Sequence, residues 1–221
     1  MPRETLDLKL KELKEEIIKL GEMVENAITR SIDVLKRRDL KEAERLIEDD
    51  MRINEKRHEI EKMCINLIAT QQPMASDLRR IIAALVISLE LERIGDHAEG
   101  IAKITIMLGE EPPIKPLIDI PRMADKTKDM LRRSLKAFME EDEEEARKIC
   151  FEDDEVDMLY DQVFRELISF MIEDPRLITR ATRLLWVAHN LERMADRVTN
   201  ICERTVFTIT GKLEEIGSSK Y

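Results

Sequence analysis

The chain has 221 residues, of which 38% are charged and only 4% are aromatic. This composition favours a helical protein, built as one large domain or as two domains of about 100 residues each. The net charge of −10 comes without a basic stripe, which argues against nucleic-acid binding, because that function needs cations to neutralise phosphates.

Apolar residues recur at helical spacing along nearly the whole chain, which predicts long helices. Asp39 with Glu42, and Asp142 with Glu145, match the capping box that begins a helix. The Pro-rich stretch 109–121 predicts the main break between helices. The expected helices cover about residues 4–38, 39–70, 73–108, 122–140, 142–172 and 174–210.

The two halves of the chain are similar in sequence. Arg30 matches Arg133 and Asp50 matches Asp153, both at an offset of 103 positions. Short turns place consecutive helices antiparallel to each other. We therefore predict an all-α fold of two tandem, up-down-up three-helix bundles related by an internal repeat. The predicted parts are a first bundle over residues 1–110, a Pro-rich linker over residues 111–120 and a second bundle over residues 121–221.

Several features indicate a cytoplasmic protein. The three cysteines are far apart and form no CxxC motif, which suits a reducing compartment. The N-terminal stretch MPRETLDLKLKEL lacks an apolar segment, so we expect no signal peptide. The longest apolar run, Ile81 to Leu89, is far shorter than the roughly 20 residues that a bilayer requires. We expect contact with a membrane only through partners.

A pair of acidic residues four positions apart occurs twice. The segment LERIGDHAEGI contains Glu92 and Asp96, and LERMADRVTNI contains Glu192 and Asp196, 100 positions later. Residues four apart share one face of a helix, where like charges repel. Glu99 falls on the same side in the first copy. Arg or Lys neighbours or a bound cation could offset this repulsion, or it could be a tolerated cost of a surface position.

The preceding helix of each half carries a further polar pair at the same spacing, Asp50 with Asn54 and Asp153 with Asp157. An all-oxygen ligand set favours hard cations such as Mg²⁺, Ca²⁺, Mn²⁺ or iron. We therefore predict one metal site in each half. The candidate metal ligands are Glu92, Asp96, Glu99, Glu192, Asp196, Asp50, Asp153 and Asp157.

Other interpretations stay open at this point. With 47 acidic residues in the chain, acidic pairs also arise on solvated faces, and Arg93 and Arg193 could bind acids of the neighbouring bundle. A metal store or a metal-dependent enzyme is the alternative function. Carboxylate di-iron enzymes use two Glu-x-x-His motifs per site, whereas this chain has a single one, from Glu55 to His58. We therefore expect a protein that is not an enzyme.

Two segments carry a family resemblance. QQPMASDLRRIIAALVISLELERIGDHAEGIAK resembles the hallmark segment of the PhoU family of phosphate-signalling proteins, and NLERMADRVTNICE resembles the matching segment of its second half. The resemblance implies two similar three-helix bundles, of the spectrin-repeat kind. It also implies that the motifs at Glu92 and Asp96, and at Glu192 and Asp196, hold multinuclear clusters of iron or another metal.

The resemblance further implies a function and partners. Members of the family are cytoplasmic negative regulators of the phosphate-starvation response. The implied partners are the ATPase of the phosphate ABC transporter, the phosphate sensor histidine kinase and a second copy of the chain as a homodimer. The two motif copies differ, because Asn54 stands where the second half has Asp157, and Glu99 where it has Thr199. We expect the two sites to differ in metal number or affinity.

Overall fold

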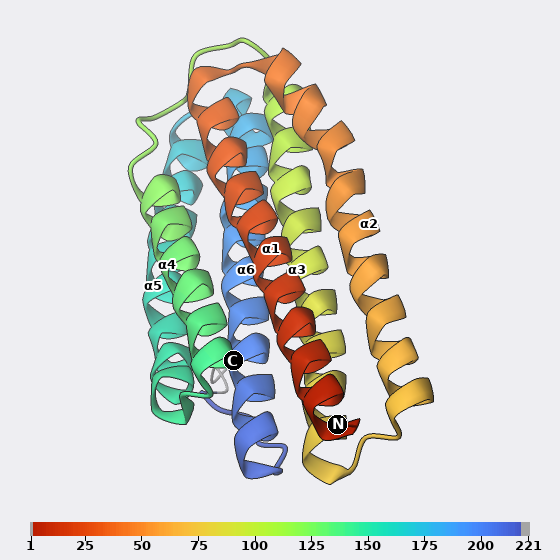
Figure 1. Ribbon diagram of the computed structural model, residues 1–221. Coiled ribbons are helices and arrows are strands. Elements are labelled where there is room, and N and C mark those ends of the chain that lie inside the picture. Colours follow the sequence, from red (N-terminus) through yellow and green to blue (C-terminus); the bar gives the residue numbers. More distant parts are fainter. Residues whose placement is uncertain (1, 218–221) are drawn as a thin grey trace.

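The computed structural model describes residues 2–217, and within them the chain forms six α-helices and one short 3₁₀ turn. The helices form two sets of three, which confirms the predicted fold class (Figure 1). No helix within this described range has the continuous apolar length that a membrane span requires. The elements are α1 (Pro2–Arg37), α2 (Leu40–Gln71), α3 (Ala75–Leu108), α4 (Asp119–Glu140), α5 (Glu143–Glu173), η1 (Pro175–Leu177) and α6 (Ile178–Thr210).

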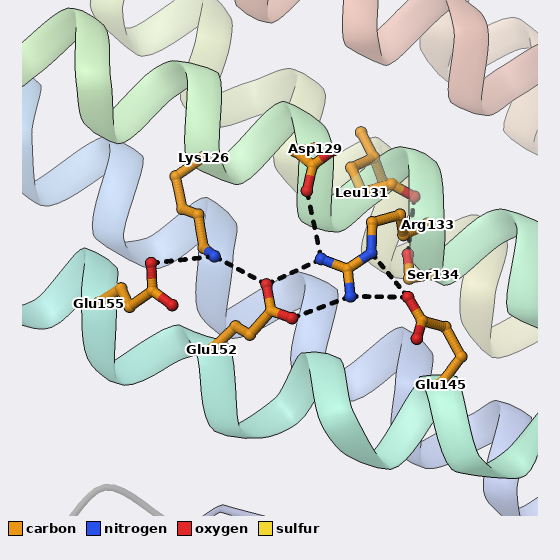
Figure 2. A network of polar contacts seen from close by, with 8 residues as sticks. All are labelled: Lys126, Asp129, Leu131, Arg133, Ser134, Glu145, Glu152 and Glu155. Carbon is orange, nitrogen blue, oxygen red and sulfur yellow. Dashed lines mark hydrogen bonds and ion pairs between the residues drawn. The ribbon is translucent and has the colours of Figure 1, made fainter.

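The turn between the first two helices is built alike in both sets. Asp39 Oδ1 accepts a hydrogen bond from the backbone N–H of Glu42 at 3.0 Å, and Asp142 Oδ1 accepts one from Glu145 at 3.0 Å. These bonds confirm the predicted caps. The reciprocal half of the capping box is wrong, because the Glu42 carboxylate binds the Arg30 guanidinium instead, at 2.7 Å. The second set makes the same exchange (Figure 2).

Two helices begin at residues other than those predicted. Helix α3 begins at Ala75 rather than at Pro73, and α4 begins at Asp119 rather than at Arg122. Pro121 therefore lies inside the first turn of α4. A proline is tolerated there because the first N–H groups of a helix have no intrahelical partner.

The two central helices join the two sets. Helices α3 and α6 pack side by side, α2 and α5 lie on opposite flanks, and α1 contacts α4 (Figure 1). Buried apolar side chains from all six helices contribute to one large core, and Val34, Ala43, Leu46 and Ala102 form a second, smaller cluster. A Cβ at Gly21 of α1 would overlap the side chain of Leu135 in α4, so glycine allows these two helices to approach closely. The division into separately folding domains stays a prediction.

Candidate metal centres

Asp50 of α2 faces the acidic turn of α3. Burial, followed by the negative charges of Asp96, Glu99 and Glu92, raises the pKa of Asp50 to about 6. Its Oδ2 accepts a hydrogen bond from Asn54 Nδ2 at 2.8 Å. Its Oδ1 is buried and has no hydrogen-bond partner within the described residues. The structure thus brings the four candidate carboxylates of the first half within electrostatic reach of one another, and we call them the first centre.

The second half repeats this arrangement with a more deeply buried aspartate. Asp153 of α5 is only 6% exposed. Burial, followed by the charges of Asp196, Asp157 and Glu192, raises its pKa to about 7. Its Oδ1, like that of Asp50, is buried without a hydrogen-bond partner in the described part of the chain. These four carboxylates are the second centre.

The surrounding carboxylates are perturbed in the same direction. Burial is the first cause of the raised pKa of Glu92, Asp96, Asp157 and Asp196, and neighbouring carboxylates contribute in each case. Each negative charge makes it harder for the next carboxyl group to ionise. Both centres therefore concentrate negative charge that the surrounding protein compensates only in part.

The arginines that follow the two motif glutamates behave differently from each other. Arg193 Nε lies 2.6 Å from Glu192 Oε2, and Arg193 Nη1 lies 3.0 Å from Asp196 Oδ2. Arg93 instead binds Glu90 at 2.8 Å, and its charge acts on Glu92 and Asp96 only as a smaller cause that lowers their pKa. Both arginines therefore bind acids of their own helices, and the alternative that they reach acids of the neighbouring bundle is wrong.

Sequence reasoning missed the polar residues between α3 and α6. Glu90 is buried, accepts a hydrogen bond from Asn200 Nδ2 at 3.1 Å and lies 3.5 Å from Arg197 Nη1. His97 Nδ1 lies 2.9 Å from Asn190 Oδ1. The available sequence signal is the apolar run from Ile81 to Leu89, which indicates a helix buried on several sides. The polar residues of such a helix need partners from neighbouring helices.

Each of the two helical sets matches a known protein domain. The model of the PhoU domain matches residues 17–105 and 120–205, one match in each helical set. This chain belongs to the PhoU family.

Curated PhoU relatives match nearly the full chain. A "phosphate-specific transport system accessory protein PhoU homolog" of Clostridium acetobutylicum is 40% identical over 96% of this chain and 97% of its own length. The Aquifex aeolicus protein of the same name is 42% identical over 83% of both chains. These names describe accessory proteins, in agreement with the expectation that the chain is not an enzyme.

Solved PhoU structures share the fold. The phosphate transport system regulatory protein PhoU of Streptococcus pneumoniae superposes with a TM-score of 0.89, at 33% identity, and covers 96% of this chain and 100% of its own. PhoU of Pseudomonas aeruginosa gives a TM-score of 0.88 at 31% identity, over 93% of this chain and 99% of its own.

The two centres can be compared with the metal clusters that the PhoU resemblance implies. Within residues 2–217, no three Asp, Glu, His or Cys side chains already form a group that could hold an ion, so the carboxylates would have to converge by rotating. The donor chemistry fits, because Asp50 and Asp153 each present a buried oxygen that lacks a donor. A cation would satisfy these oxygens and relieve the repulsion. The candidate ligand assignments stay predictions.

The two positions that differ between the sequence copies also differ in structure. Glu99 of the first centre binds Lys103 Nζ at 2.6 Å. Thr199, at the matching position, donates its hydroxyl to the backbone carbonyl of Asp196 at 2.7 Å. Asn54 donates to Asp50, whereas Asp157 adds a negative charge beside Asp153. An ion would therefore meet different neighbours in each centre.

Proposed function

We propose that this PhoU protein is a cytoplasmic accessory regulator of phosphate uptake. In this proposal it represses the phosphate-starvation response when phosphate is plentiful, and it acts through the ATPase of the phosphate ABC transporter and through the phosphate sensor histidine kinase. The observation that supports the role most directly is 40% identity, over 96% of the chain, to a protein named as an accessory of phosphate-specific transport.

The helical architecture suits regulation by docking. A regulator shifts its partner between two states only if it binds one state more tightly than the other. A tenfold shift needs about 1.4 kcal/mol of differential affinity, which a few contacts supply. Large, exposed apolar side chains are available for such contacts, including Trp186 of α6, which is 51% exposed, and Phe164 of α5, which is 43% exposed. We also propose self-association into a homodimer, which light scattering would test.

The two acidic centres are proposed to hold hard metal ions, with multinuclear iron as the first candidate. Asp50, Glu92, Asp96 and Glu99 would hold metal in the first centre. The second would use Asp153, Asp157, Glu192 and Asp196. The support is the pair of buried, unpartnered aspartate oxygens at equivalent positions. Elemental analysis of protein purified without added metal tests this proposal.

A reporter experiment tests the regulatory role. A strain that lacks this protein should express a phosphate-starvation reporter in phosphate-rich medium, and the intact gene should restore repression. Pull-down with the transporter ATPase and the kinase then identifies the direct partner. Full repression in the deletion strain would contradict the regulatory role. Such a result, together with metal-loaded protein, would favour the alternative of a metal store or a metal-dependent enzyme.

A further inference from the structure

The first bundle contains a groove on its surface. At two equivalent positions of the second bundle, larger side chains take up this space. This groove lies between α1 and α2, has a volume of about 640 Å³ and reaches Gly95 of α3 at its floor. The volume lies within the range of small-molecule sites, which is roughly 300–1,000 Å³. On α1 the lining extends from Lys19 to Arg30, which are 11 residues apart and therefore about 16 Å apart along the helix.

The internal repeat shows that two positions of this groove carry smaller side chains than their counterparts in the second bundle. Ala27 lines it on α1, and the residue 103 positions later is Met130, which is fully buried in the second bundle. Gly95 at the floor corresponds to Ala195. A larger side chain thus occupies both positions in the second bundle.

A polar bridge crosses the equivalent surface of the second bundle. Lys126 of α4 contacts Glu152 at 2.7 Å and Glu155 at 3.0 Å, both on α5 (Figure 2). The residue that matches Lys126 in the first bundle is Met23, which lines the groove and cannot form such a bridge. The matching surface between α1 and α2 therefore lacks this bridge.

The charges in the groove favour a cationic ligand. Glu22 and Glu55 line it without an ion pair among the described residues. Asp50 also lines it, and its unpartnered Oδ1 lies 3.5 Å from the position that a Cβ on Gly95 would take. In contrast, each of the four basic side chains in the lining already has a carboxylate partner. These pairs are Lys19 with Glu16, Lys56 with Glu16 and Glu59, Arg30 with Glu42 and Asp49, and Arg52 with Asp49.

Apart from Asn26 and Gly95, the uncharged lining is apolar. Met23, Ala27, Leu46 and Ile53 contribute to it, so the groove suits a ligand with a hydrocarbon body. We propose that this groove binds a small amphipathic organic amine, with its alkyl or aryl body over these residues and its ammonium group toward the unpaired carboxylates. This proposal does not depend on the role in phosphate regulation proposed above. The groove shares Asp50 with the first centre, so the binding test is made with a chelator present.

The test uses three probes with the same six-carbon chain, namely hexylamine, hexanol and hexanoate. Each is titrated into the full-length protein, and binding is followed by the backbone amide signals of Ala27 and Gly95 in NMR spectra. Hexylamine should bind saturably and more tightly than hexanol, and hexanoate should bind most weakly. Equal affinity for hexanoate and hexylamine would overturn the proposal. Saturable shifts of other amide signals, with those of Ala27 and Gly95 unchanged, would also overturn it.

Two substitutions locate the site. Ala27→Met copies the second bundle and should weaken hexylamine binding about tenfold or more, because the new side chain occupies the groove. Ala69→Met, on an exposed position of α2, is the matched control and should leave the affinity unchanged. Wild-type affinity in Ala27→Met would overturn the proposal.

A charge substitution keeps the proposal testable if the groove-filling variant folds poorly. Glu55→Gln removes one unpaired carboxylate from an exposed position and should weaken hexylamine about threefold while leaving hexanol unchanged. Glu48→Gln, also exposed on α2 but outside the groove lining, is the control. Equal effects of the two substitutions on hexylamine would show that only the overall charge matters, against the proposed site.

Discussion

Replacing Asp153 with Asn tests whether the second centre holds uncompensated negative charge in the metal-free protein. The pKa of Asp153 rises from an ordinary value of 3.8 to about 7. Each unit corresponds to about 1.4 kcal/mol, so ionised Asp153 lowers the free energy of unfolding by up to about 4 kcal/mol. Because the neighbouring carboxyl groups titrate together with it, we expect a gain of about 2–4 kcal/mol from the substitution at pH 8.

The gain should depend on pH with a defined sign. The folded protein holds the Asp153 proton more tightly than the unfolded chain does, so Asp153 costs no stability below pH 3.8. The cost grows as the pH rises from 3.8 toward 7, and it is constant above that. Asn resembles the protonated acid at every pH. The difference in stability between variant and wild type should therefore be near zero at pH 4 and reach its full size by pH 8.

Urea unfolding followed by circular dichroism, with a chelator present, measures this difference. Asp154→Asn is the matched control, since Asp154 is the exposed neighbour in the same helix, and it should change stability little at either pH. Adding Mn²⁺ at pH 8 should stabilise the wild type more than the Asp153 variant. A metal-free Asp153→Asn protein that is less stable than the wild type at pH 8 would refute the reasoning.

Three further predictions concern the first centre and the packing of the helices. Replacing both Glu92 and Asp96 with Ala should remove metal from the first centre and leave the helical dichroism intact, and unchanged metal content would contradict the assignment. Gly21→Ala should change the free energy of unfolding by no more than about 1 kcal/mol, because its methyl group overlaps only the movable Cδ1 end of Leu135, while alanine gains about 0.5–1 kcal/mol over glycine inside a helix; a large fall in the urea midpoint would count against this. A fragment of residues 1–110 should unfold cooperatively but self-associate through the face of α3 that packs on α6, and a chain without a cooperative transition would exclude an independent first core.

Local sequence signals predict the helices and the register of the acidic residues. Asp39 and Asp142 cap helices as expected, because capping depends on residues three positions apart. The spacing of Glu92 and Asp96 places both beside Asp50, because helical periodicity fixes a face once the core stripe is known. These features depend on backbone geometry that short stretches determine.

Contacts between helices that are distant in sequence could not be predicted from local sequence signals. The Glu42 carboxylate binds Arg30 instead of completing its capping box, because a guanidinium from the preceding helix competes for it. Likewise, the burial of Asp153 depends on how α5 packs on α6. No single segment of the sequence predicts these contacts. Even a correct set of predicted helices therefore does not determine the ion pairs or the pKa values of the carboxylates in the two centres.

The two centres share one helical arrangement but differ in how neighbouring charges compensate them. In the second centre, Arg193 already contacts Glu192 and Asp196, so an incoming cation must compete with a guanidinium for both motif carboxylates. In the first centre, Arg93 pairs with Glu90 instead, so a cation at Glu92 and Asp96 would compete less with a guanidinium. A positive charge near the site lowers the affinity for a cation, and the effect is stronger at shorter distances. Since α3 and α6 pack on each other, the two proposed sites lie on one pair of central helices, and we expect them to differ in affinity and to fill at different ion concentrations.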